Sequence, residues 1–379
     1  MRFEEAYTGW TGKRLTQEEA AKILGICARS FRRYIERYQE EGLEGLGDKR
    51  LVQASHRCAP VDEVLRLTED YSSRYSGWNV KHYYSHYRGS GGDRSYSWVK
   101  SQLQTAALVP KLKRKGQHRK RREASPLPGM MIHQDGSTHE WVPEKAWDLI
   151  VTMDDATNEH YSMFFVEEEG TVSSLRGVQE VIEQRGLFCS FYSDRGSHYW
   201  TTPEAGGKVD KTHLTQFGRA LKQLGIEQIA AYSPEARGRS ERAFRTHQGR
   251  LPQELALAGI TDIKAANHYL ATSYKAKHNK EFSHKAREEG SAFVAFVGPP
   301  VGEILCEQFE RTVSKDNCVS FEGTILQIPA DRHRMHYMKA KVMVRRYLDG
   351  SLSVSHGPRR LCHYDTKGQA KSLPLEEAA

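Results

Sequence analysis

The most constraining feature of this chain is the order of its apolar segments between Met130 and Leu255. Period-two and continuous apolar runs predict three consecutive strands, after which helical spacing alternates with further short strands. The predicted elements are strands at 133–142, 147–154 and 160–166, a helix at 172–184, a strand at 187–192, a helix at 211–224, a strand at 227–231 and a helix at 239–255. Such an order predicts a mixed sheet with helices on its faces.

Three acidic residues lie at the ends and edges of these predicted elements. Asp135 lies in the first strand, Asp194 directly follows the fourth, and Glu241 lies near the start of the last helix. Mg²⁺ prefers hard oxygen ligands and keeps several waters, so a few converging carboxylates suffice to hold it. Two such ions roughly 3.5–4 Å apart stabilise the attacking and the leaving oxygens of a phosphodiester cleavage. We therefore expect Asp135, Asp194 and Glu241 to be catalytic and to bind two Mg²⁺ ions, with Mn²⁺ as a substitute.

Each of these acids also has an ordinary interpretation. The segment 194–197, Asp-Arg-Gly-Ser, has the composition of a turn. Asp154 and Asp155 end the second predicted strand and compete for the first position, and Glu235 competes for the third. Glu241 is favoured over Glu235 because it falls inside a predicted helix.

The composition restricts the class of protein. The chain has 379 residues, enough for two to four domains, and a formal net charge of +8. Its mean hydropathy is −0.69, and no apolar run is long enough to cross a bilayer. The first residues lack the features of a secretory signal, and the six cysteines contain no CxxC pair, which argues against a disulfide framework and a cysteine-pair zinc site. We expect a cytoplasmic protein without a membrane partner.

The first fifty residues predict a helix-turn-helix unit. Thr16 and Glu19 have the spacing of a capping box, so a helix should begin there, and Gly25 allows the turn into a second helix. The predicted DNA-contacting residues lie on the outer side of that second helix: Arg29, Arg32, Arg33 and Arg37. A small helical hairpin without a DNA-binding role has a similar composition.

A second helical unit is predicted at 58–109, with helices at 61–75, 80–87 and 95–107. In the third of these helices, Val99, Leu103 and Ala107 are expected to be buried. The outward side would then present polar groups suited to DNA, at Tyr96, Ser97, Lys100, Ser101 and Gln104. The alternative is that one of the two units only packs against the rest of the protein.

A basic run at 111–122 follows the helical units and contains eight cations without an acid. Phosphate contact is the favoured interpretation, and a solvated linker is the alternative. The expected DNA contacts in this run are Lys113, Arg114, Lys115, Arg119, Lys120, Arg121 and Arg122.

The fold class predicted from these segments is a multidomain α+β protein. Short alternating strands after residue 298 indicate a small basic β-barrel. The expected domains are helix-turn-helix units at 1–50 and 58–109, a basic linker at 110–129, a catalytic core at 130–297, the barrel at 298–365 and a tail at 366–379.

The core resembles the RNase H-like integrase core of DDE transposases and retroviral integrases, and is similar to insertion-sequence transposases of the ISNCY and related groups. The matching residues are Asp135 in His-Gln-Asp-Gly, Asp194 in Ser-Asp-Arg-Gly-Ser, the Ser-Pro pair at 233–234, and Glu241 in Gly-Arg-Ser-Glu-Arg. The interval of 47 residues from Asp194 to Glu241 is longer than in many relatives, and the segment 203–211 resembles an inserted loop. His198, Arg237 and Arg242 are expected to contact DNA near the metals or to be ordinary surface groups, and Tyr274, Asn279 and Phe282 are expected to pack.

This resemblance implies a transposase that acts in DNA recombination and integration. Metal-activated water would free 3′-hydroxyl ends on double-stranded transposon DNA at its terminal inverted repeats, and transesterification would join those ends to target DNA. Two transposon ends must be held together, which implies a homo-oligomer, at least a dimer on DNA. The resemblance also implies a location in a prokaryotic cytoplasm, close to the nucleoid. The alternatives are a helix-turn-helix regulator and an RNase H-like nuclease without strand transfer.

Overall fold

The computed structural model describes residues 2–48, 59–111, 123–203, 207–232, 238–330 and 332–371. Two compact units are present: residues 1–76 with 93–110, and residues 77–92 with 111–379. Among the described residues, no helix is long and apolar enough to cross a membrane. The five cysteines in those residues are free thiols, which agrees with the expectation of no disulfide framework.

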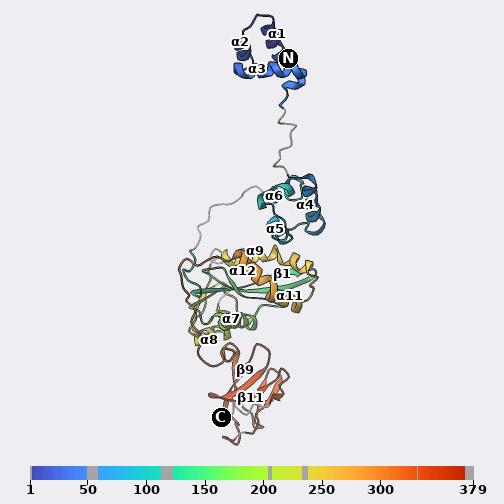
Figure 1. The fold of residues 1–379 in the computed structure, drawn as a ribbon. Helices are drawn as coiled ribbons and strands as arrows, with labels where there is room; N and C mark the ends of the chain where they lie inside the picture. Colours follow the sequence, from blue (N-terminus) through green and yellow to red (C-terminus); the bar gives the residue numbers. More distant parts are fainter. Residues whose placement is uncertain are drawn as a thin grey trace. The chain divides into compact units, whose positions relative to one another are not determined.

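Three helices form the start of the first unit: α1 (Arg2–Thr11), α2 (Gln17–Ile23) and α3 (Ala28–Glu41) (Figure 1). The predicted capping box is confirmed, because the Thr16 side chain accepts from the Glu19 amide and the Glu19 carboxylate accepts from the Thr16 amide. Gly25 turns the chain between α2 and α3 with a φ of +68°. Ala20, Phe31 and other apolar side chains make a small core between the helices. The predicted helix-turn-helix arrangement is therefore present.

The second predicted helical segment contains α4 (Val61–Arg74), α5 (Val80–Gly89) and α6 (Tyr96–Thr105). Val99 and Leu103 of α6 are fully buried, as expected. Ala107 was expected to be buried with them, and that prediction is wrong. α6 ends before it, and Ala107 takes a left-handed φ of 56° on the surface.

A five-stranded mixed sheet forms the centre of the second unit, with strand order β3-β2-β1-β4-β5. The strands are β1 (Met131–Val142), β2 (Lys145–Asp154), β3 (His160–Val166), β4 (Ser190–Ser193) and β5 (Glu227–Ala230). β1, β2 and β3 form an antiparallel meander, and β4 and β5 run parallel to β1. This is the mixed sheet that the order of apolar segments predicts.

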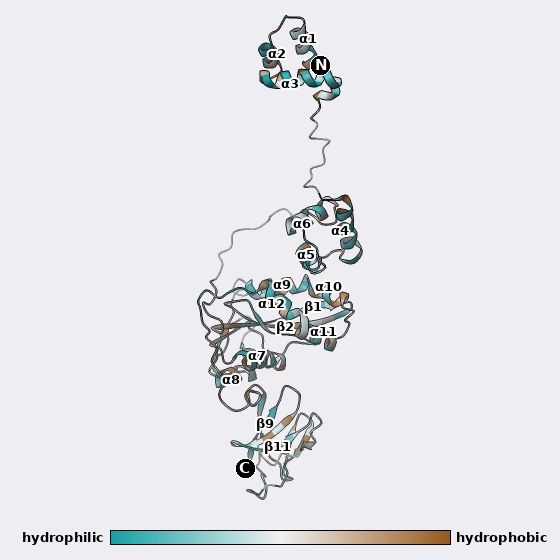
Figure 2. Ribbon diagram, viewed as in Figure 1, coloured by the Kyte–Doolittle hydropathy of each residue, from teal (hydrophilic) through white to brown (hydrophobic). Residues whose placement is uncertain are grey.

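Helices cover both faces of the sheet, as Figure 1 shows. On one face, α7 (Thr171–Arg185) and α8 (Gln216–Gln223) cover a core that includes Ile132 and Phe191. On the other face lie α9 (Gly238–Gln248), α10 (Leu251–Leu257), α11 (Ile263–Tyr269) and α12 (Lys275–Phe282), with a π-helical turn at Leu270–Tyr274. The hydrophobic residues of β2 and β3 therefore lie in the middle of a three-layer arrangement (Figure 2).

Two predicted helices differ from the observed ones. The helix predicted at 239–255 is divided into α9 and α10, because Pro252 has no amide hydrogen to continue the helix and instead lies in the first turn of α10. The helix predicted at 211–224 begins only at Gln216. Before the helix, the Asp210 carboxylate accepts from the Thr212 amide at 2.7 Å, and this contact holds the backbone there in a turn. Thr215 is the N-cap of the helix.

The C-terminal region is an antiparallel sheet with strand order β12-β11-β10-β9-β6 and a separate β7-β8 hairpin. Its strands are β6 (Glu307–Thr312), β7 (Cys318–Phe321), β8 (Thr324–Gln327), β9 (Lys341–Arg346), β10 (Leu352–His356), β11 (Arg359–Tyr364) and β12 (Ala370–Lys371). Apolar side chains of the hairpin and the sheet share one core. Among the described strands, no hydrogen-bonded ladder joins β12 to β6, so the predicted closed barrel is not observed.

Candidate active site

Asp135 lies in β1, and Asp194 directly follows β4, the parallel strand that pairs with β1. β1 pairs with β4 in a register that places Met131 opposite Ser190 and His133 opposite Tyr192. Continuing the same offset for two residues places Asp194, the first residue after β4, opposite Asp135 of β1. Adjacent strands are about 4.8 Å apart, so this offset makes the two aspartates neighbours.

Asp135 is on the face of the sheet that α9 covers. Side chains alternate between faces within a strand, so Asp135 shares the face of His133, whose Nε2 lies 2.7 Å from the Asp155 carboxylate. The His133 and Tyr192 rings lie side by side with centroids 4.9 Å apart. On the opposite face, Gln134 contacts α7, where its amide donates to the Ser174 carbonyl at 3.2 Å. Asp135 is nearly buried, with 7% exposure.

Two contacts fix α9 over the sheet, and Glu241 lies between them in the sequence. At one end, Arg239 contacts the Asp155 carboxylate. At the other, the Gln248 amide donates to Ser137 Oγ at 3.0 Å. Gln248 lies nine residues after Arg239, and a helix rises about 1.5 Å per residue, so the two contacts are about 13 Å apart along α9. About four residues of a strand span the same length. Glu241 lies seven residues before Gln248, about two turns, and is therefore on the same side of α9.

The three acids do not form a closed ligand set in the structure. Only two groups of three or more His, Cys, Asp or Glu residues within the described segments bring their ligand atoms within 4.8 Å of one another, and these acids are not among them. Glu241 is exposed, and Asp194 is half-buried, with its Oδ1 accepting from the Gly196 amide at 2.9 Å.

The competing aspartates are engaged in structural contacts. Asp154 accepts from the amides of Gly129 and Thr157. Asp155 is fully buried and lies 2.7 Å from His133 Nε2. Burial alone would raise the pKa of Asp155, but the hydrogen bond with His133 and the charge of Arg239 hold that pKa well below its ordinary value. Both carboxylates thus hold the backbone and α9 in place, and the third competitor, Glu235, lies outside the described residues.

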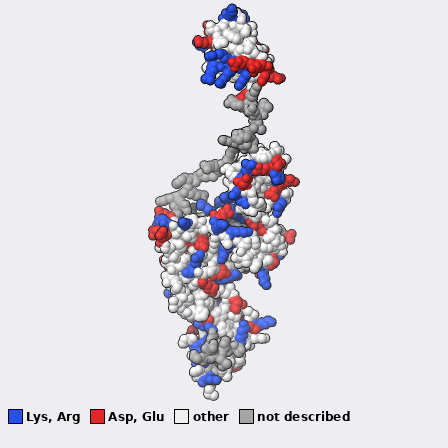
Figure 3. All heavy atoms as spheres, viewed as in Figure 1, with Lys and Arg blue, Asp and Glu red and all other residues white. Residues whose placement is uncertain are grey.

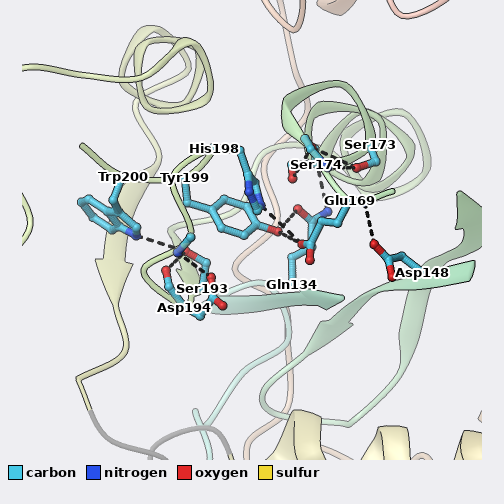
Figure 4. A network of polar contacts seen from close by, with 12 residues as sticks. Gln134, Asp148, Glu169, Ser173, Ser174, Ser193, Asp194, His198, Tyr199 and Trp200 are labelled. Atoms are coloured by element: carbon cyan, nitrogen blue, oxygen red, sulfur yellow. Dashed lines mark hydrogen bonds and ion pairs between the residues drawn. The ribbon is translucent and has the colours of Figure 1, made fainter. Parts of the chain in front are cut away.

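A polar network that the sequence did not reveal lies on the α7 face, close to Asp194 (Figure 4). The Tyr199 hydroxyl lies 2.9 Å from Gln134 Oε1 and 3.3 Å from Glu169 Oε1. His198 Nε2 is 3.4 Å from the same Glu169 oxygen. Burial, together with the charge of Glu169, raises the pKa of Tyr199 far above its ordinary value, so this hydroxyl remains a donor. In the sequence, the only sign of this network is Glu169 before Gly170 at the start of a predicted helix, and this pattern is common.

The Asp194 loop is held by its own contacts. Trp200 Nε1 donates to Ser193 Oγ at 3.2 Å, beside Asp194 in Figure 4. The Tyr199 and Trp200 side chains are buried in the core under α7 and α8. The segment predicted to be an inserted loop at 203–211 follows, and residues 204–206 of it lie outside the described residues.

The predicted DNA contacts of the first unit are on the surface. The four α3 arginines, Arg29, Arg32, Arg33 and Arg37, are exposed, and Figure 3 shows basic side chains gathered on this helical domain beside acidic ones. On α6, Ser97, Lys100 and Ser101 are exposed, and Tyr96 and Gln104 are half-buried.

The remaining predicted DNA contacts divide into two groups. Arg242 is exposed on α9, next to Glu241. The others lie outside the described residues: Lys113, Arg114, Lys115, Arg119, Lys120, Arg121, Arg122 and Arg237.

Comparisons with known proteins agree with this arrangement. Residues 6–61 match the family model described as a winged helix-turn helix. The chain is 27% identical over 353 residues to y4bF of Sinorhizobium fredii, a protein named as a candidate transposase, in an alignment that covers 90% of this chain and 75% of y4bF. It is 28% identical over 227 residues to the transposase for insertion sequence IS1202 of Streptococcus pneumoniae, covering 59% of this chain and 48% of that protein.

Solved structures give weaker matches. The magnesium-bound catalytic core of the HTLV-2 integrase is 13% identical, covers 42% of this chain and 98% of its own, and has a TM-score of 0.31. A chain of a simian T-cell lymphotropic virus intasome is 13% identical, covers 74% and 94%, and has a TM-score of 0.33. TM-scores this low do not establish a shared fold. Over most of its length, the chain is thus similar in sequence to bacterial proteins named as transposases, and at its N-terminus to winged helix-turn-helix domains.

Proposed function

We propose that this chain is a DDE transposase of an insertion sequence, with an RNase H-like core of the integrase type. The observation that supports it best is that Asp135 lies in β1 and Asp194 directly follows β4, the parallel strand paired with β1, in a sheet that α9, the helix of Glu241, covers. The similarity to proteins named as transposases supports the same function independently of this geometry.

The donor set fits magnesium. Three carboxylates offer hard oxygen ligands and leave positions for water and phosphate. When bound, a pair of Mg²⁺ ions would stabilise charge at the attacking and leaving oxygens of the phosphodiester. Asp135 and Asp194 would hold the ions from the sheet, and Glu241 from the helix. The half-buried Arg239 at the start of α9 fixes that helix through Asp155.

The basic surfaces supply the DNA contacts of the proposal. The arginines of α3 and the polar side chains of α6 would bind terminal inverted repeats, and the run at 111–122 would contact phosphates. Arg237 and Arg242 flank Glu241 in sequence and would bind the DNA strand near the reacting phosphate. Because two ends are joined to one target DNA, the active form is proposed to be at least a dimer.

The test uses the purified full chain, Mg²⁺, and duplexes that carry the ends of the encoding element. The expected result is cleavage at the end that frees a 3′-hydroxyl, followed by joining of that end to a target plasmid. Glu241→Gln removes a charged ligand with little change in shape and should abolish both products. Glu183→Gln is the matched control, because Glu183 is exposed on α7, where it only accepts from Gln179 at 2.7 Å.

Three outcomes decide between the functions. Equal cleavage by the intact chain and Glu241→Gln rejects the role of that residue. Cleavage without joining identifies a nuclease, and end binding without any metal-dependent cleavage identifies a DNA-binding regulator.

A further inference from the structure

A second cluster of metal-ligating side chains lies inside the core, away from the three acids. His160 of β3, His247 of α9 and His278 of α12 are buried, with exposures of 2%, 0% and 6%. Each offers a ring nitrogen, and these three nitrogens lie within 4.8 Å of one another. The rings are packed together, with centroids 4.3–5.1 Å apart. Three elements thus converge on one point through imidazoles alone.

The hydrogen bonds of His160 determine which of its nitrogens is available. Nδ1 of His160 lies 3.1 Å from the Asn158 carbonyl, which can only accept, so Nδ1 carries the proton. In a neutral ring, Nε2 of His160 therefore presents a lone pair to the cluster. That atom lies 3.0 Å from His247 Nε2. His247 has its other nitrogen, Nδ1, 3.2 Å from the Tyr274 hydroxyl. Metal-binding histidines characteristically hold their second ring nitrogen in this way.

His278 supplies the third ligand and an unsatisfied atom. Its Nδ1 is buried and has no hydrogen-bond partner among the described residues. The neighbouring Asn279 fixes α12 to β3 at the cluster, because its side chain accepts from the His160 amide and donates to the His160 carbonyl, both at 2.9 Å. The π-helical turn at Leu270–Tyr274 immediately precedes this part of α12. A buried nitrogen without a partner costs free energy, and a bound ion would remove that cost.

Neutral imidazoles are the form that binds a metal. Burial lowers the pKa of His160 to about 4 and of His278 to about 2, and it lowers the pKa of His247 well below its ordinary value. The nearest cations are engaged elsewhere. Arg250 pairs with both oxygens of Glu281 at 2.7 and 3.0 Å, and Lys275 donates to the Tyr161 carbonyl at 2.8 Å.

We propose that His160, His247 and His278 form a site for a first-row transition-metal ion, with Zn²⁺ as the fitting occupant. Imidazole ligands favour Zn²⁺ over Mg²⁺, so this ion is distinct in chemistry and place from any ion held by the carboxylates. Because α9 carries both His247 and Glu241, the ion would fix that helix to β3 and α12.

The test is metal loading of the purified full chain with Zn²⁺ alone, followed by dialysis and elemental analysis. The intact chain should retain about one ion, with X-ray absorption showing three imidazole nitrogens at about 2.0 Å. His278→Phe keeps a buried ring but removes a ligand, and should retain no ion. Removing the ion should lower the midpoint of thermal unfolding of the intact chain by roughly 5–10 °C and leave that of His278→Phe unchanged.

His82→Phe is the matched control. His82 is also buried, at 1% exposure, and it belongs to the other cluster of ligand atoms, with His86 and Glu254. This variant should keep the ion. Loss of the ion in His82→Phe with retention in His278→Phe would overturn the assignment, as would sulfur or carboxylate ligands in the absorption spectrum. An intact chain that retains no Zn²⁺ would also refute the proposal.

Discussion

Gly177 lies in the middle of α7, where helix propensity and packing predict opposite effects of Gly177→Ala. Alanine is favoured over glycine inside a helix by about 1 kcal/mol. A Cβ at this position, however, would lie 2.6 Å from Thr152 Oγ1 and would collide with the Gln134 amide nitrogen. The Gln134 amide is buried, donates to Thr152 at 2.8 Å and to the Ser174 carbonyl at 3.2 Å, and accepts from Tyr199.

Displacing the Gln134 amide would break this set of bonds. Overpacking a core costs about 1–3 kcal/mol, and each buried polar group left without a partner costs about 1–3 kcal/mol. After subtraction of the gain in helix propensity, Gly177→Ala should lower the free energy of unfolding by about 1–5 kcal/mol, centred on about 3 kcal/mol. In a domain of this size, the midpoint of core unfolding should fall by roughly 5–10 °C.

Calorimetry of the full chain measures this effect. Gly89→Ala is the control, because Gly89 ends α5 and no heavy atom of the described residues lies within 4 Å of the added Cβ, so that variant should be neutral or slightly stabilising. In a double-mutant cycle, the cost of Gly177→Ala should shrink by at least about 1 kcal/mol when Gln134 is already alanine. A core midpoint that rises in Gly177→Ala would falsify the packing argument and leave propensity as the dominant effect.

Three further predictions concern the anchor of α9, a helix cap and the DNA surface. The pKa of Asp155 is lowered by His133 and Arg239 from an ordinary value of 3.8, so its carboxylate stabilises the fold above that pH and the contribution is lost as the pH falls below it. Asp155→Asn should therefore cost about 3–5 kcal/mol at pH 7 by denaturant unfolding, and less with each step below pH 4, whereas a pH-independent cost would contradict this. Thr16→Ala removes the capping box and should destabilise α2 by about 1 kcal/mol, seen as faster amide exchange in that helix only. Arg33→Ala should weaken binding to end DNA and reduce the slope of log K against log salt by about 1, and an unchanged slope would mean no phosphate contact there.

Local patterns predicted those parts of the fold that depend on neighbouring residues. The capping box at Thr16 and the strands of the central sheet follow from side chains only a few positions apart, so period and composition were sufficient. The side chain of Pro252 divides α9 from α10, and this break was also encoded locally. However, the apolar spacing continues on both sides of Pro252, and for this reason the pattern predicts one helix instead of two.

The candidate site could be predicted only in part. The positions of Asp135 in β1 and of Asp194 directly after β4 agree with the strands that the sequence predicts. Glu169 approaches the site from the loop before α7. His160, His247 and His278 come together only because β3, α9 and α12 pack against one another. These partners are 87 and 118 residues from His160, so no periodicity links them. Such contacts depend on how the elements pack.

The placement of α5 has a consequence for dissecting the protein. Residues 77–92 cluster with the sheet unit, although α4 and α6 on either side belong to the other one. His82 and His86 of α5 lie 2.7 and 2.9 Å from the same oxygen of Glu254, which follows α9 on α10. A fragment cut after the second helical segment, at Lys111, would leave that carboxylate without its imidazoles. Loss of activity in such a truncated piece would therefore reflect a damaged scaffold as readily as lost DNA binding.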